Sequence, residues 1–295
     1  MLLRPVLRAG EGASRVVDAT VGGGGHAAAF LAGGARVLGI DRDPDAIAAA
    51  RVRLGEAGIT YLEASFGAPV ALAAVASFRP EFILLDLGVS SRQLDDPSRG
   101  FTFRPGAPLD MRMGEEGDSA AELLNGLDQA SLTKIFTDYA DERKSGRLAR
   151  EIVRRRERVP FAISDDLVNA IRAVLGPRSG PGDFARLFQA IRIAVNDELE
   201  VLEHALVRFR DALAPGGRLA VISYHSGEDR VVKHLFRDWA RACICPSRSP
   251  VCTCRGHPLG RMEPTKPIVA DAAEVAANPR ARSARLRVFR VGHGA

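Results

Sequence analysis

The stretch RVVDATVGGGGHAAAFL, residues 15–31, decides the fold of this chain. It predicts a short apolar strand at 15–18, a glycine-rich turn, and a helix from about 27 to 31. Gly22, Gly24 and Ala27 fit the pattern G-x-G-x-x-A. Such a turn lets the backbone approach a ligand closely, with helix N–H groups facing it. A plain tight turn is the alternative interpretation of the same glycines.

The flanking sequence continues an alternation of strand and helix. Short apolar runs predict strands at 36–40, 59–62, 82–85 and 218–224, with helices at 44–54 and 70–77 among the connections. Buried runs separated by helices are typical of a parallel sheet covered on both faces. The predicted fold class is therefore α/β, with a doubly wound, Rossmann-like sheet. Two further strands, at 266–269 and 285–290, are expected to close it.

An all-helical region interrupts this pattern. Ser119-Ala-Ala-Glu122 is a capping box, and helical periodicity follows at 128–138, 143–157 and 165–175. The segment 184–213 is predicted to be one long helix. We therefore expect a sheet domain made of residues 1–104 and 183–295, with a helical, substrate-binding domain inserted at 105–182.

Bulk composition limits where such a protein acts. The 295 residues carry a net charge of +5, and 46% are hydrophobic, which is ordinary for a soluble folded chain. No apolar run approaches the roughly 20 residues that span a bilayer, and the N-terminus has no signal-peptide pattern. The four cysteines all fall within 243–254, unlike a secreted disulfide framework. The sequence predicts a cytoplasmic protein with no membrane partner, and it is compatible with a homodimer.

Acidic residues at the predicted strand ends indicate the cofactor. Asp41 ends the second strand, where a carboxylate accepts hydrogen bonds from ribose hydroxyls, whereas Asp43 is better placed to cap a helix. NAD and S-adenosyl-L-methionine both use this kind of site. The closing strands after LAPGGRL, residues 213–219, resemble those of class I methyltransferases, so S-adenosylmethionine is favoured. Asp86 follows the fourth strand, where reacting groups meet, and Phe66 is either an adenine contact or a core residue.

Several stretches, in order along nearly the whole chain, together resemble the small-subunit ribosomal RNA cytosine-N4 methyltransferases. They are DATVGGGGHA (18–27), GIDRDPDAI (39–47), LLDLGVSSRQLDDPSRGFTF (84–103), PLDMRM (108–113), FQAIRIAVNDEL (188–199), YHSGEDR (224–230) and NPRARSARLRV (278–288). The resemblance implies a class I methyltransferase sheet and methylation of a cytidine in the decoding region. By position, it places the cofactor contacts on Gly24, Gly25, His26, Asp41, Phe66, Asp86 and Gln93.

Two carboxylates are candidates for the catalytic base. Cytosine N4 is a poor nucleophile, and a carboxylate that accepts its N–H would strengthen it and take the proton. Asp86 and Asp110 fit this role, although Asp110 is also suited to an ion pair with Arg112. His225 is a candidate proton relay, with loop fixation as the alternative. The sequence lacks the Pro-Pro-aromatic motif of DNA amino-methyltransferases, so amino-group specificity rests on the resemblance.

A stripe of arginines predicts the nucleic-acid surface. Arg143, Arg147, Arg150 and Arg154 share one face of a predicted helix. A face that binds the phosphates of small-subunit ribosomal RNA, within the ribosomal particle, is favoured over a merely solvated helix. A second basic cluster is expected either to extend this surface or to protect an edge strand. It comprises Arg280, Arg282, Arg285, Arg287 and Arg290.

The cysteines follow the spacing C-x-C-x6-C-x-C at Cys243, Cys245, Cys252 and Cys254. Four clustered thiols can hold zinc, but zinc-binding pairs are usually spaced C-x2–4-C. Free cysteines in a loop are the alternative, so the sequence alone assigns no metal ligand.

Two other functions compete with N4 methylation of ribosomal RNA. One is methyl transfer to another RNA, to DNA or to a small molecule. The other is a non-catalytic, RNA-binding ribosome assembly factor that keeps the cofactor fold. Labelled methyl transfer to ribosomal subunits separates all three.

Overall fold

The computed structural model describes residues 1–88, 96–114, 117–245 and 251–292. The chain forms two compact units, one made of Met1–Gly88 with Leu199–Ala295 and the other of Val89–Glu198. Each has its own apolar core. Among the described residues, no helix is both long and apolar enough to cross a membrane.

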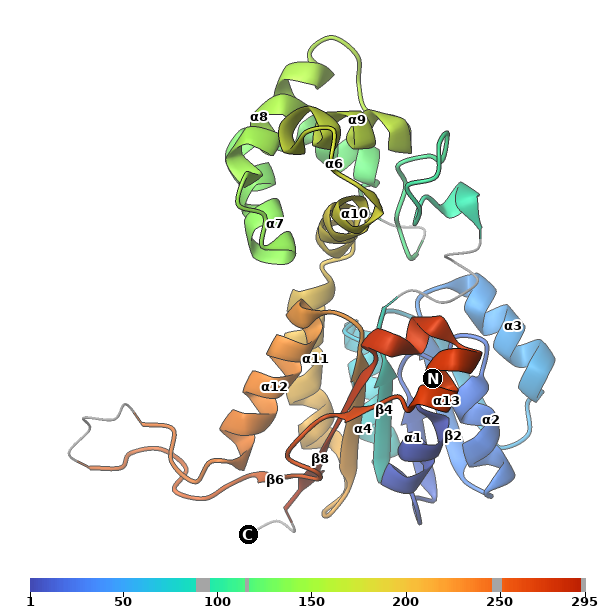
Figure 1. The fold of residues 1–295 in the computed structure, drawn as a ribbon. Helices are drawn as coiled ribbons and strands as arrows, with labels where there is room; N and C mark the ends of the chain where they lie inside the picture. The colour runs from blue at the N-terminus through green and yellow to red at the C-terminus, as the bar shows by residue number, and fades with distance from the viewer. Residues whose placement is uncertain (89–95, 115–116, 246–250, 293–295) are drawn as a thin grey trace. The chain divides into compact units, whose positions relative to one another are not determined.

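The first unit is an eight-stranded sheet with the order β3-β2-β1-β4-β5-β8-β6, where β7 also pairs with β8 (Figure 1). Strands β1 to β5 are parallel, and β8 runs antiparallel to β5. The α/β class and the doubly wound sheet are confirmed. The strands are β1 Arg15–Asp18, β2 Arg36–Asp41, β3 Ile59–Glu63, β4 Phe82–Asp86, β5 Arg218–Ser223, β6 Gly260–Met262, β7 Ile268–Val269 and β8 Arg285–Val291.

Alternate residues of the strands pack against helices on opposite faces of the sheet. Ile83 and Leu85 of β4 share one core with α4, α11 and α12, whereas Phe82 and Leu84 share the other with α1, α2 and α3. This alternation explains why the runs are continuously apolar. The helices of this unit are α1 Leu3–Ala9, α2 Gly25–Ala32, α3 Pro44–Leu54, α4 Pro69–Phe78, α11 Glu198–Ala212, α12 Ser226–Ala240 and α13 Ala272–Ala277.

The second unit is helical, as expected. Its helices are α6 Ala120–Gly126, α7 Gln129–Ala140, α8 Ser145–Arg156, α9 Ser164–Leu175 and α10 Pro181–Val195. The predicted capping box is present, since Ser119 and Glu122 each accept a hydrogen bond from the other's backbone N–H. The unit boundaries differ from the expected 105–182, because Leu187 and Ile191 of α10 are fully buried in the same core as α7.

The expectation of one helix over 184–213 is wrong. The helix ends at Val195, and α11 begins at Glu198. Asn196 is buried, and its amide donates to the carbonyls of Met111 at 2.8 Å and Arg192 at 2.9 Å, while its oxygen accepts from the N–H of Met113 at 3.0 Å. Asp197 then adopts a left-handed conformation with φ of 49°. These side-chain bonds compete with the helical ladder and break the helix.

Candidate active site

Three carboxylates end adjacent parallel strands at one edge of the sheet. Asp18 ends β1, Asp41 ends β2 and Asp86 ends β4. Strand β1 lies between β2 and β4, and the strand order reverses there. In an open α/β sheet, the crevice outside the carboxyl ends of the strands at such a reversal is the usual ligand site.

The glycine turn leads from β1 to α2 beside these carboxylates. Gly22 and Gly24 have φ of 50° and 75°, a conformation that favours glycine. A Cβ atom at Gly24 would lie 2.7 Å from Leu54 Cδ1, whereas one at Gly23 or Gly25 would meet nothing within 4 Å. The turn therefore leaves open space next to the first N–H groups of α2, as the approach of an adenosyl group requires.

Asp41 is oriented by backbone groups. Its Oδ2 accepts from the N–H of Gly22 at 2.9 Å, and its Oδ1 accepts from the N–H of Asp43 at 3.0 Å. Burial raises the pKa of this carboxyl, while the backbone N–H groups of Asp43, Gly22 and Arg42 act to lower it. A carboxylate has about four lone-pair sites, so the group can still accept from a ribose hydroxyl. Asp43 caps α3 by accepting from the N–H of Asp45, as predicted.

Asp86 is held by groups from three parts of the chain. Its Oδ1 accepts from the hydroxyl of Tyr224 at 2.6 Å, its backbone N–H donates to Thr20 Oγ1 at 2.7 Å, and its Oδ2 lies 3.8 Å from His26 Nδ1. Burial raises the pKa of Asp86, while His26 and the Tyr224 hydroxyl act to lower it. Among the three groups just named, none donates a hydrogen bond to Asp86 Oδ2. This oxygen can therefore accept a hydrogen bond from a substrate N–H.

His26 is placed by the first turn of α2. Its Nε2 lies 2.9 Å from the carbonyl of Met1 and donates to it, which leaves Nδ1 facing Asp86. Burial lowers the pKa of the imidazole. The side chain therefore contacts Asp86 directly, consistent with its predicted place in the cofactor site.

Asp18 is a member of this group that sequence reasoning missed. Its side chain is buried, and Oδ1 has no hydrogen-bond partner among the described residues. Burial first, and then the charge of Asp86, raise the pKa of Asp18 to about 7. Backbone N–H groups of Thr20 and Ala27 act in the opposite direction. Its position at the end of β1, beside the glycine turn, is the sequence signal that could have identified it.

The other predicted residues have different surroundings. Phe66 packs against Phe209, with ring centroids 6.5 Å apart, and is only partly buried. His225 caps α12, where its Nδ1 accepts from the N–H of Glu228 at 3.4 Å. Gln93 lies outside the described residues.

Asp110 belongs to the helical unit and is engaged there by Arg112. Its two oxygens lie 2.9 Å from the Nε and Nη2 atoms of that guanidinium. These hydrogen bonds lower the pKa of Asp110. The ion pair considered from the sequence is therefore present, and the carboxyl is held in its charged form.

The family follows from comparison with known proteins. The model of the MraW methylase family matches residues 5–291. The chain belongs to this family. It is 61% identical over 283 residues to a protein of Gemmatimonas aurantiaca named ribosomal RNA small subunit methyltransferase H, covering 94% of this chain and 90% of that one. A protein of the same name from Heliobacterium modesticaldum is 48% identical, covering 92% and 90%.

Solved structures give more distant matches. An rRNA methylase from Streptococcus thermophilus has a TM-score of 0.40 and 13% identity, covering 99% of this chain and 92% of that one.

Membership of the MraW methylase family confirms the resemblance predicted from the sequence. The chain is a methyltransferase of the class I fold, and S-adenosylmethionine is its methyl donor. The crevice fits that donor, since the open glycine turn and the doubly oriented Asp41 carboxylate are the groups that an adenosine needs.

The helical unit of this methyltransferase carries the predicted arginine stripe. Arg143, Arg147, Arg150 and Arg154 are exposed, while Leu148 and Ile152 on the other side of α8 are buried. Glu151 neutralises part of the stripe, because it pairs with Arg154 and Arg155 at 2.7 Å. Within the described parts of the chain, Arg147 and Arg150 have no ion pair.

Three members of the second basic cluster have partners within the sheet unit. Arg287 is buried and pairs with Asp229 at 2.7 Å, and Arg285 pairs with the same carboxylate at 3.2 Å while its side chain stays half exposed. Arg290 donates to the carbonyl of Gly216. Extension of the α8 surface by this cluster stays a prediction. Protection of an edge strand is wrong, since β8 lies between β5 and β6.

Proposed function

We propose that this protein transfers a methyl group from S-adenosylmethionine to the N4 amino group of a cytidine in the decoding region of small-subunit ribosomal RNA. It does so on the ribosomal particle, in the cytoplasm. The observation that carries the proposal is the Asp86 carboxylate, which the Tyr224 hydroxyl holds at the end of β4. The names of the relatives support the ribosomal RNA substrate.

Residues around the glycine turn would hold the donor. Asp41 would accept from the ribose hydroxyls. Gly25 would offer open backbone to the methionine part, and Gly24 would shape the turn through its positive φ. The partly exposed ring of Phe66 would contact the adenine, and His26 would lie beside the methionine part. Gln93 is a cofactor contact only by the family resemblance. The bound donor supplies an electrophilic methyl group on a sulfonium.

Asp86 acts on the acceptor. Its Oδ2 accepts a hydrogen bond from the N4 amino group and so holds the nitrogen lone pair toward the methyl carbon. As the amino nitrogen is methylated, Asp86 would take its proton and release it to solvent. The Tyr224 hydroxyl keeps the carboxylate in one orientation. His225 supports this arrangement as the cap of α12, and Asp110 orders the loop that contains Arg112.

The acceptor base must leave its stack to reach Asp86. The exposed arginines of α8 would bind phosphates of the same RNA, because they are cations on one helix face and Arg147 and Arg150 have no ion pair among the described residues.

The test is methyl transfer to small ribosomal subunits that lack the modification. We expect label from S-adenosylmethionine to enter their ribosomal RNA and nucleoside analysis to give N4-methylcytidine. Label in carbon-5 of cytosine, or in DNA or small molecules alone, would refute the assignment. Cofactor binding without transfer to any acceptor would instead indicate an assembly factor.

Two matched variants test the base. Asp86→Asn keeps the size of the side chain but cannot accept the proton, so we expect kcat to fall by about 100-fold or more with RNA affinity retained. Asp110→Asn removes a carboxylate that already serves Arg112, and we expect a loss below about 10-fold. The reverse order of the two losses would move the base to Asp110.

A further inference from the structure

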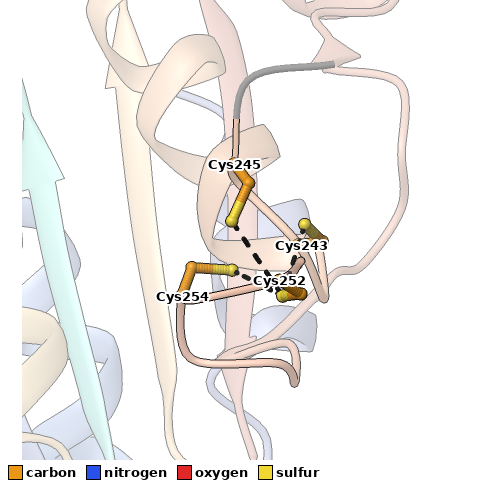
Figure 2. A group of neighbouring side chains, drawn as sticks. All are labelled: Cys243, Cys245, Cys252 and Cys254. Atoms are coloured by element: carbon orange, nitrogen blue, oxygen red, sulfur yellow. Dashed lines mark hydrogen bonds between the residues drawn. The ribbon is translucent and has the colours of Figure 1, made fainter. Parts of the chain in front are cut away.

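Four thiols converge in the connection between α12 and β6. Cys243 and Cys245 follow the end of α12, and Cys252 and Cys254 precede β6. Their sulfur atoms point toward one another (Figure 2). Cys252 Sγ lies 3.7 Å from Cys243, 4.0 Å from Cys245 and 3.5 Å from Cys254, and all four sulfurs are within 4.8 Å of one another.

These separations match a tetrahedral thiolate site. With zinc–sulfur bonds of about 2.3 Å, tetrahedral geometry puts neighbouring sulfurs about 3.8 Å apart. A disulfide would instead require about 2.05 Å, and all four cysteines are free. The two C-x-C pairs therefore place four sulfurs around one point despite their short spacing.

The backbone around the thiols is organised as well. Cys254 Sγ accepts from the N–H of Ile244 at 3.3 Å, which stabilises negative charge on the sulfur. Arg255 follows directly and donates to the carbonyls of Asp238 and Arg241 at the end of α12. The N–H of Leu259 donates to the carbonyl of Trp239 at 2.8 Å. The cluster is thus attached to the C-terminal end of α12, which packs against the sheet through Val232, Phe236 and Trp239.

We propose that Cys243, Cys245, Cys252 and Cys254 bind one Zn²⁺ ion in a four-thiolate site. Four protein ligands leave no open position for water or substrate, so the site is structural and takes no part in methyl transfer. It fixes the connection between α12 and β6, whose exposed thiols would otherwise be open to oxidation. The proposal is independent of the RNA substrate.

Metal analysis of the full chain tests this site. We expect one zinc ion per chain after purification without chelators, and background levels in the variant that combines Cys252→Ser with Cys254→Ser. Val251→Ser is the matched control, since it changes an exposed neighbour in the same loop and should retain the metal. Replacement by Co²⁺ should give the absorption bands of a tetrahedral tetrathiolate.

The reactivity of the four cysteine thiols gives a second test, which can overturn the proposal. In the zinc form, the four thiols should react slowly, and a chelator should release the metal and expose all four. The proposal is overturned if the reduced chain contains no zinc and four freely reactive thiols, or if the cysteines are isolated as two disulfides. Loss of zinc should lower the Tm reported by Trp239 fluorescence while leaving the affinity for S-adenosylmethionine unchanged.

Discussion

Two carboxylates at neighbouring strand ends dominate the chemistry of single residues. Burial raises the pKa of both Asp18 and Asp86, and the charge of Asp86 raises that of Asp18 further. The Tyr224 hydroxyl donates a hydrogen bond to Asp86 and so acts to lower the pKa of that carboxyl. Because the two acids interact, their titration belongs to the pair, and neighbouring groups decide which one keeps its proton.

Removing the Tyr224 hydroxyl should move the pH dependence of catalysis. Asp86 must be ionised to accept a proton, and the Tyr224 hydroxyl lowers its pKa. In Tyr224→Phe that pKa rises, so the acid limb of the kcat/KM profile should shift to higher pH. Tyr61→Phe is the control, since that hydroxyl donates to the carbonyl of Gly55. An unshifted limb with a uniformly lower rate would mean that Tyr224 only fills space.

Asp18 should make the sheet unit less stable as pH rises. Its folded pKa of about 7 lies above the ordinary value of 3.8, so the folded state holds the proton longer than the unfolded state. The loss in the free energy of unfolding is absent below about pH 4, grows between about pH 4 and pH 7, and is complete above about pH 7. About three pH units at about 1.4 kcal/mol each give a cost of about 4 kcal/mol.

Asp18→Asn should therefore be more stable than the parent at pH 8 and similar at pH 4. Unfolding followed by the fluorescence of Trp239, the single tryptophan, reports this unit. A difference that does not change with pH would contradict the raised pKa of Asp18.

At the scale of elements, α8 is the clearest site for a prediction. Replacing Arg147 and Arg150 together by glutamine should weaken RNA binding and reduce the slope of log K against log salt by about 1.4 to 1.8. Arg154→Gln with Arg155→Gln removes the same charge from the same helix. Those arginines already pair with Glu151, so the slope should change less. Equal effects of the two pairs would show that only net charge matters.

The sequence predicted elements best where burial is continuous. The runs that became β1, β2, β4 and β5 are apolar on both faces, so their pattern needed no tertiary context. Strand β6, Gly260–Met262, was missed because three residues with an exposed arginine have no such pattern. The break at Asn196 was missed because its partners, Met111 and Met113, are remote in sequence.

In the candidate site as well, some residues could be predicted from local sequence and others depend on tertiary contacts. Asp41 and Asp86 could be predicted because strand ends at a topological switch have a known role. Tyr224 could not be singled out, because its contact with Asp86 depends on the pairing of β4 with β5. The role of Arg287 was misread for a similar reason, since its partner Asp229 lies on α12.

At the scale of the whole molecule, the two units should respond separately to mutation. Phe136 is fully buried in the helical unit, and Phe136→Ala should cost that unit about 3–5 kcal/mol. Far-UV circular dichroism should show an earlier helical transition, while the Trp239 transition stays in place. If both transitions move together, the chain unfolds as one cooperative body.

The separation of β4 from β5 along the chain has a consequence during synthesis. The helical unit is continuous, from Val89 to Glu198, so it can fold on the ribosome as soon as it emerges. During this time the edge of β4 stays unpaired, because its neighbour β5, and then β8, are translated later. We expect the nascent chain to need chaperone protection at that edge, and the methyl-donor crevice to be the last part of the enzyme to mature.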